Sequence, residues 1–318
     1  MVMSRETAGS AVPAEPGEPP TAPVEREFTV KARSQRQQIL RRFLRDKVGM
    51  AGLGIFTAML AFGFLGPLVY GGRYDRLDRE AQSLPPGTPG YPLGSDAVGR
   101  DQLAALMEGV QRSMFIVLLF VLIALPLGLL VGVLAGYFGR WTDSVLMRLV
   151  DLVLTVPLLV VLIVVASNFP SYRTPLGVGI ILGLFGWLDL ARIMRSQFLS
   201  LREKEFVEAA HALGASNRRI IFKHLIPNAL GSLIVWATIA AATAIILEAA
   251  LTYLGFGVNG ANETSLGRQV SDGVQAASTR PWLFYFPGIT LLTIVLSINL
   301  IGDGIRDAFD PASRRVRA

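Results

Sequence analysis

The residues best suited to a specific interaction lie in one polar stretch, 201–227, between two long apolar segments. Adjacent membrane spans are usually joined by short turns, so a polar insert of this length indicates contact with a soluble partner. Read as a helix, its first half carries an apolar stripe and a charged stripe. The apolar stripe contains Phe206, Ala209, Ala210 and Leu213, and the charged stripe contains Arg202, Glu205 and Glu208. The stretch therefore predicts either a docking element, with small alanines admitting a partner backbone, or an interfacial helix lying on lipid.

The ends of two short helices can be predicted within this stretch. Ser200 and Glu203 have the spacing of a capping box, and Gly214 can take the left-handed conformation that ends a helix. Ser216 can cap a second short helix, and Pro227 would separate that helix from the next apolar span. We therefore expect two short helices, each with its own cap.

Acidic residues also occur inside apolar segments, where each costs several kcal/mol unless it faces a partner or a water path. Glu248 has two possible roles, lining a translocation path or pairing with a polar group on a neighbouring helix, and the second is favoured. Asp151 follows Arg148 by three residues, which predicts an ion pair on one helix face. Asp189 precedes Arg192 by three residues and is interpreted in the same way.

Signatures of a catalytic or metal site are absent from the sequence. It has no cysteine, and its two histidines, His211 and His224, have neither metal-ligand spacing nor catalytic partners. No phosphate-binding G-x-x-x-x-G-K-[ST] loop occurs, so we expect this chain not to bind ATP by that motif. We predict no catalytic residue and no metal ligand, and the chain is expected not to be an enzyme.

Composition identifies an all-α integral membrane protein. The chain has 318 residues, of which 52% are hydrophobic, and a mean hydropathy of +0.48. About six segments are long and apolar enough to span a bilayer. These predicted spans are 48–70, 113–137, 149–168, 176–196, 229–254 and 284–302.

Basic residues set the expected orientation, with both termini in the cytoplasm. Lysine and arginine gather before the first span, in 201–227 and after the last span, which the positive-inside rule assigns to the cytoplasmic face. This bias and anionic lipid account for the net charge of +6, so no nucleic-acid partner is expected. Because no apolar stretch of signal-peptide length precedes Val48, the first span is expected to be an uncleaved anchor. The predicted parts are listed in chain order: a disordered tail (1–30), a basic segment (31–47), the membrane domain (48–312) and a second tail (313–318).

A second polar segment, 71–112, is predicted on the outer side. It contains the run PLGSDAVGRD, with Gly94, Asp96, Gly99, Arg100 and Asp101. Ser95 or Asp96 can cap a helix, and the chain reads as helical from Asp101 into the second span. Arg100 and Asp101 could hold the turn by pairing or by capping.

Small and helix-bending residues mark the second and third spans. Gly128, Gly132 and Gly136 recur every four residues, which predicts close helix packing within the chain or against a second membrane subunit. Pro126 and Pro157 are expected to kink their spans.

These motifs together resemble the permeases of ATP-binding-cassette (ABC) importers. Glu208-Ala209-Ala210, followed by Gly214 and Pro227, resembles their EAA loop. The run from Gly94 to Asp101 resembles the signature of the dipeptide/oligopeptide (DppC/OppC-like) subfamily, although Tyr91 replaces its usual histidine. The segment 299–311, NLIGDGIRDAFDP, is similar to the subfamily's C-terminal motif. The resemblance runs from about residue 40 to residue 312, in the family's order.

The resemblance implies a multi-pass subunit of the cell (inner) membrane with a cytoplasmic EAA-type coupling loop, 198–228. The implied ATPase-coupling residues are Glu205, Glu208, Ala209, Ala210 and Gly214. The implied partners are the bilayer, a second homologous permease, two ABC ATPases that bind ATP and magnesium, and an extracytoplasmic substrate-binding protein. No cofactor is expected in this chain. Di- or oligopeptides are the implied solutes. The alternatives are an ion-coupled secondary transporter, a permease of the same family for nickel complexes or other non-peptide solutes, or a scaffold subunit.

Overall fold

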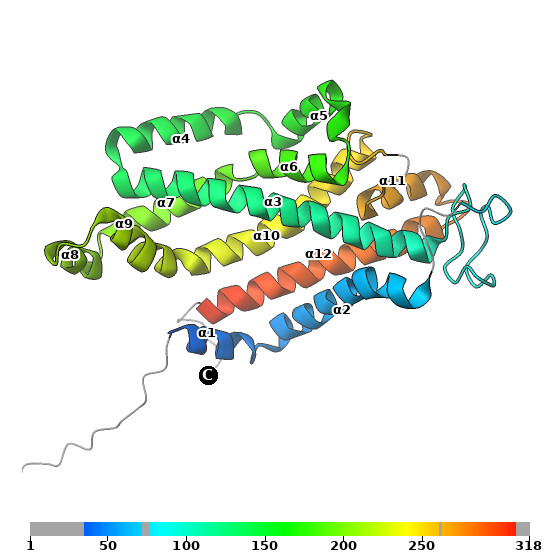
Figure 1. Cartoon of the computed structure of the whole chain (residues 1–318), viewed down its shortest axis with the longest axis horizontal. Helices are drawn as coiled ribbons and strands as arrows, with labels where there is room; N and C mark the ends of the chain where they lie inside the picture. Colours follow the sequence, from blue (N-terminus) through cyan, green and yellow to red (C-terminus); the bar gives the residue numbers. More distant parts are fainter. Residues whose placement is uncertain (1–34, 72–76, 261–262, 310–318) are drawn as a thin grey trace, which may run out of the picture.

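The computed structural model describes residues 35–71, 77–260 and 263–309, which form an elongated bundle of helices (Figure 1). Within these residues there is no extended strand, which confirms the all-α prediction. The first helices are α1 (Gln35–Phe43), α2 (Lys47–Tyr70), α3 (Gln102–Phe138), α4 (Arg140–Leu154), α5 (Leu158–Asn168), the short η1 (Pro170–Tyr172), α6 (Pro175–Phe185) and α7 (Leu188–Arg202). They are followed by α8 (Glu205–Ala212), α9 (Asn217–Ile220), the short π-helix η2 (Ile221–Leu225), α10 (Ile226–Tyr253), α11 (Leu266–Ala276) and α12 (Trp282–Phe309).

Five helical stretches in the described residues are long and apolar enough to cross a membrane, and a sixth candidate is bent. The five stretches are Lys47–Tyr70, Gln102–Phe138, Pro175–Arg202, Asn217–Tyr253 and Trp282–Phe309. The predicted third span, 149–168, is instead divided between α4 and α5, which meet at 74°. Pro157 explains the break, because proline removes a backbone donor and disfavours helical geometry in the residue before it.

Helix α3 is the central element of the bundle. It packs along α6 and α7 and also contacts α2 and α10, while α12 lies between α2 and α10 (Figure 1). The predicted glycine stripe lies in the contact between α3 and α7. A Cβ atom at Gly132 would lie 2.5 Å from Cβ of Met194 and 2.7 Å from the carbonyl oxygen of Ala191. The stripe therefore serves packing within this chain.

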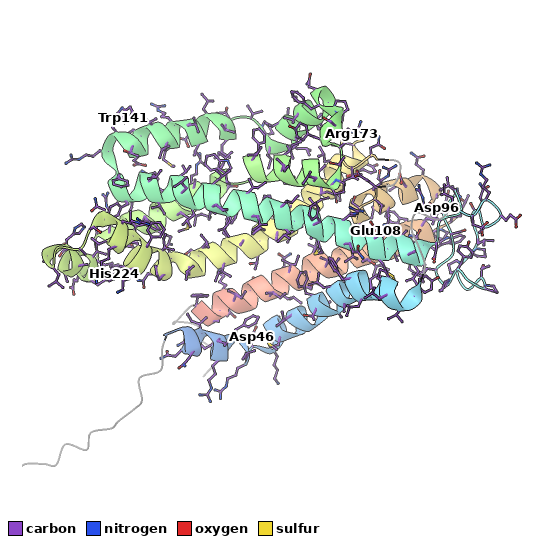
Figure 2. All side chains as sticks on the ribbon, in the orientation of Figure 1. Asp46, Asp96, Glu108, Trp141, Arg173 and His224 are labelled. Carbon is purple, nitrogen blue, oxygen red and sulfur yellow. The ribbon has the colours of Figure 1, made fainter. Side chains whose placement is uncertain are left out.

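The two ends of the bundle carry different structures. Helix α8, helix α1 and the end of α12 lie at one end, whereas the polar segment before α3 lies at the other with α11 (Figure 1). Figure 2 shows the same separation, with His224 near the first end and Asp96 at the second. The predicted tails, 1–30 and 313–318, lie outside the described residues.

Candidate functional site: a coupling surface and a membrane cavity

Helix α8 occupies the polar stretch, but its start differs from the prediction. Ser200 lies inside α7, which continues to Arg202, so the predicted capping box does not form. The N-cap residue of α8 is Lys204, which provides no side-chain hydrogen bond to the helix. The capping box fails because the preceding span extends past Ser200, so this residue is never at a helix start.

The C-terminal side of α8 follows the sequence more closely. Gly214 has φ +76°, the left-handed conformation expected of it. The Ser216 hydroxyl oxygen accepts a hydrogen bond from the amide of Arg219, which caps α9 as predicted. Pro227 does not separate α9 from the next span, because the chain stays helical from Asn217 to Tyr253. Proline is tolerated there because it occupies the first turn of α10.

The predicted apolar stripe of α8 is largely exposed. Leu213 is 88% exposed and Phe206 is 40% exposed, and Ala209 is exposed between them. Ala210 points inward and is buried with Val207, whereas the Glu205 and Glu208 side chains are exposed. The surface formed by Phe206, Ala209 and Leu213, which we call the α8 face, is thus available to a partner.

Polar contacts hold the α8 region to the end of α3. The Arg202 guanidinium donates to the carbonyl oxygens of Gly136 and Tyr137, each at 3.4 Å. The Tyr137 hydroxyl donates to Oδ1 of Asn217 at 2.9 Å. Both flanks of α8 are therefore tied to one membrane helix, so a displacement of α8 would be transmitted to α3.

The polar segment at the opposite end is a folded turn closed by Asp96. Its Oδ1 atom accepts from the amides of Val98, at 2.9 Å, and Arg100, at 2.8 Å. Gly99 has φ +84° and lies directly against the backbone of Asp78, and Gly94 has φ +79°. Glycine is required at both positions, because a side chain would meet strain and backbone atoms.

Asp101, and neither Ser95 nor Asp96, caps the following helix. Its Oδ1 atom accepts from the amide of Leu103 at 2.9 Å, at the start of α3. Ser95 is buried, and its hydroxyl group donates to the Ala81 carbonyl oxygen instead. The prediction that Asp101 holds this turn is confirmed, whereas the prediction of a cap by Ser95 or Asp96 is wrong.

Glu248, on α10, is 1% exposed, and its side chain contacts the start of α11. Its Oε1 atom accepts from the hydroxyl groups of Ser265, at 2.6 Å, and Thr252, at 2.9 Å. The Ser265 hydroxyl oxygen also accepts from the amide of Arg268 and so caps α11. This geometry favours the structural role, a carboxylate bonded to a neighbouring helix, over a position in a path.

The acids nearer α4 and α7 do not form the predicted local pairs. Asp151 pairs with Arg192 across the two helices, at 2.5 Å, and not with Arg148. Asp143 pairs with Arg195 between the same helices. Asp189, predicted to pair with Arg192, has no hydrogen-bond or ion-pair partner among the residues that the structure describes. Asp143 and Asp151 pair with arginines of α7, and not within their own helix, because α4 lies beside α7. Residue spacing within one helix cannot reveal that neighbour.

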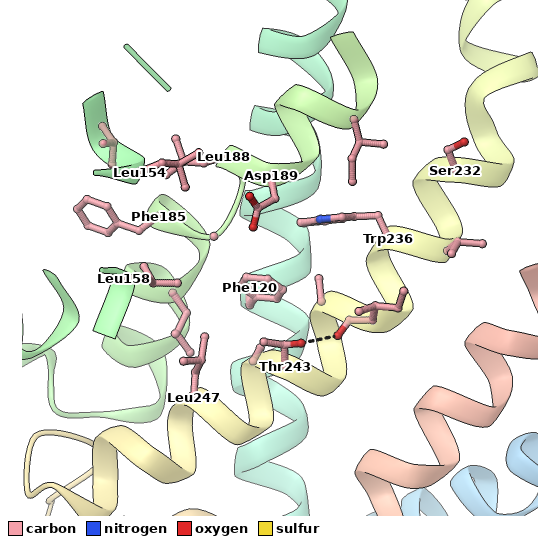
Figure 3. Close-up of a pocket in the computed structure, with 18 of the residues that line it drawn as sticks. Phe120, Leu154, Leu158, Phe185, Leu188, Asp189, Ser232, Trp236, Thr243 and Leu247 are labelled. Carbon is pink, nitrogen blue, oxygen red and sulfur yellow. Dashed lines mark hydrogen bonds between the residues drawn. The ribbon is translucent and has the colours of Figure 1, made fainter. Parts of the chain in front are cut away.

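Asp189 lines a cavity of about 880 Å³ between α4–α5, α6–α7 and α10. Figure 3 shows its carboxylate at the level of the Trp236 ring, with Phe120 close by. The walls are mostly aliphatic and aromatic, and polar groups are few. This volume is within the range of small-molecule sites. The sequence did not predict the cavity; the only signal was an acid in an apolar span.

Comparison with known proteins identifies the class of this molecule. Residues 128–315 match the family described as "Binding-protein-dependent transport system inner membrane component", and residues 34–86 match "N-terminal TM domain of oligopeptide transport permease C". The chain belongs to this transport family. It is a multi-pass membrane permease subunit and not an enzyme, which confirms the family resemblance of its motifs.

Relatives align with this permease over most of their length. The "Oligopeptide transport system permease protein OppC" of Mycobacterium tuberculosis (strain ATCC 25618 / H37Rv) is 39% identical over 284 residues, covering 89% of this chain and 97% of the relative. The OppC protein of Haemophilus influenzae is 36% identical over 289 residues, covering 91% and 92%. The methionine ABC transporter MetNI, solved in inward-facing conformations, is 21% identical, with 65% of this chain and 94% of that chain covered and a TM-score of 0.49.

Proposed function

We propose that this chain is one of two permease subunits of an ATP-driven importer for di- or oligopeptides. The named relatives, oligopeptide permeases that align over nearly their whole length, support the peptide class. A second homologous permease would complete the translocation path, and a binding protein would deliver the solute on the outer side. Two ATPases on the cytoplasmic side would bind ATP and magnesium, so this chain would need no cofactor.

The observation that carries the proposal is the exposed α8 face. Burying apolar side chains such as Phe206 and Leu213 against a partner would be favourable, because it removes their apolar surface from water. The stripe that they form is short, and the carboxylates of Glu205 and Glu208 are exposed beside it. Such a patch suits a protein groove with an apolar floor and a polar rim. The basic residues of this end support a cytoplasmic position by the positive-inside rule, on the side where an ATPase would be.

In this proposal, the ATPase-coupling residues divide into three kinds by their surroundings. Exposed Glu205 and Glu208 would make polar contacts, and Ala209 would allow close approach of the ATPase backbone. Buried Ala210 and left-handed Gly214 would maintain the shape of the loop. ATP binding would move the ATPases together, and α8 would carry that motion to α3 through Arg202. Solute and ATP would thus shift the population between inward- and outward-facing states.

The rival classes are less well supported. Family membership does not favour an ion-coupled carrier, and such a carrier would leave the α8 face unexplained. A permease for nickel complexes would need a different delivery protein, and the two OppC relatives named above are oligopeptide permeases.

A charge placed on the α8 face tests the docking surface. Leu213→Asp should leave insertion and folding unchanged, because this side chain is 88% exposed and packs little within the chain. It should reduce peptide uptake and co-purification of the ATPases by tenfold or more, because a carboxylate would be buried in an apolar groove. Uptake by membrane vesicles and recovery of the tagged complex from mild detergent measure the two effects.

His211→Asp is the matched control, since it adds the same charge on the opposite side of α8, where His211 is also exposed. This variant should retain most of the uptake. Normal uptake by stably expressed Leu213→Asp protein would refute docking through the α8 face. Equal losses in both variants would point to a general charge effect at this end of the molecule.

A further inference from the structure

The cavity between α6–α7 and α10 is lined by one acid, Asp189, near the middle of a candidate membrane span. Asp189 belongs to the candidate span Pro175–Arg202, fourteen residues after its first residue and thirteen before its last. At about 1.5 Å per residue, the carboxylate is roughly 20 Å along the helix from either end. The apolar core of a bilayer is about 30 Å thick, so Asp189 would lie near the middle of the membrane if this span crosses it symmetrically.

An unpaired carboxylate at this depth is costly. Acids within spans usually face a partner, a water-filled space or a solute path, and the cost falls when a cation is supplied. Asp189 is exposed to the cavity, and the nearest arginine along its own helix, Arg192, is already paired with Asp151 at 2.5 Å. In the described ranges, the only other charged residue lining the cavity is Arg306, in the last turn of α12. Within the described chain, no basic group is therefore bonded to Asp189.

The walls around Asp189 also suit a cation. Trp236 extends toward the carboxylate from α10, and Phe120 lies on the same side of the cavity (Figure 3). Aromatic faces attract ammonium groups, most strongly where water is scarce. The remaining lining is aliphatic, with small polar groups such as Ser232 and Thr243, and it would accept side chains of many shapes.

We propose that Asp189 receives the ammonium group of the solute as it crosses the membrane, either a peptide amino terminus or a lysine side chain. The inference rests on the proposed function, because it assumes that this cavity is part of the translocation path. In this proposal, Asp189 alone makes passage across the membrane favour solutes that carry a positive charge. Of the residues that the structure describes, the one cationic side chain that lines the cavity, Arg306, belongs to the last turn of α12.

Uptake of paired peptides by the reconstituted complex tests this role. At saturating binding protein, and corrected for the affinity of each peptide for that protein, the wild-type complex should take up a tripeptide at least tenfold faster than its N-acetylated form. Asp189→Asn should reduce this ratio to near one, and Asp189→Glu should retain it. Ser232→Ala, in the same cavity, should leave the ratio unchanged. An unchanged ratio in Asp189→Asn would overturn the proposal. Loss of the second permease from the Asp189→Asn complex would also overturn it, because Asp189 would then be a contact between subunits.

A labelling experiment tests the same preference without transport. The chain has no cysteine, so Ser232→Cys gives it a single thiol, which lies in the cavity, and the complex without this substitution supplies the background rate. The measured quantity is the labelling rate of a cationic methanethiosulfonate divided by that of an anionic one. This ratio should be several-fold higher when Asp189 is present than in the Asp189→Asn background. Equal relative rates in the two backgrounds would overturn the proposal. A complex that shows the cation preference but transports no peptide would refute the peptide substrate and leave the role of Asp189 standing.

Discussion

At the scale of single residues, Glu248 illustrates how a buried acid can hold two helices together. Its carboxylate accepts from Ser265 on α11 and from Thr252 on its own helix. Gly267 makes room for the second carboxylate oxygen, since a Cβ there would lie 2.8 Å from Oε2. The function of the residue is therefore expected in folding stability and not in choice of solute.

Substitution of Glu248 should separate these two roles. Glu248→Ala should lower the free energy of unfolding by about 2–4 kcal/mol, because it leaves a cavity and removes the acceptor of the buried Ser265 hydroxyl hydrogen. Glu248→Gln, which keeps the accepting oxygen, should cost about 1 kcal/mol or less. Thermal unfolding of the purified protein in detergent measures both. A Glu248→Ala protein of normal stability with altered solute preference would instead place Glu248 in the path.

At the scale of helices, α3 packs closely on α7 because glycines such as Gly132 leave no side chain between them. Gly132→Val should displace α7 from α3, because even the first added carbon would lie 2.5 Å from Met194 and 2.7 Å from the Ala191 carbonyl oxygen. We expect a loss of about 1–3 kcal/mol or more and a lower unfolding temperature. The control is Gly54→Val in α2, where a Cβ atom would meet nothing within 4 Å. Similar unfolding temperatures for Gly132→Val and wild type would contradict tight packing at this crossing.

At the scale of the whole molecule, the two ends of the bundle should face opposite compartments. Val98, in the polar segment before α3, and Leu213, on the α8 face, are both exposed, and the chain has no cysteine. In spheroplasts expressing this chain alone, a membrane-impermeant maleimide should label Val98→Cys directly. It should label Leu213→Cys only after permeabilisation, because the positive-inside rule assigns the basic end to the cytoplasm. Labelling in the reverse order would invert the proposed topology.

A feature was predicted correctly where the residues that determine it are close together in the sequence. Gly214 and Ser216 were predicted correctly, because a left-handed glycine and a serine cap act within a few residues. Ser200 was mispredicted because its capping role depended on where the preceding span ended. Asp151 was assigned the wrong arginine, since the correct one lies on another helix.

The sequence by itself determined that this is a helical membrane protein with a polar loop between two of its spans, because apolar length and polarity are properties of contiguous segments. It also carried the motifs of a transport family. Only the tertiary structure decided that Glu248 bonds to Ser265 and that Asp189 opens into a cavity beside Trp236. Those relations join helices far apart in the chain, and they depend on the packing of side chains, which spacing along one helix does not specify.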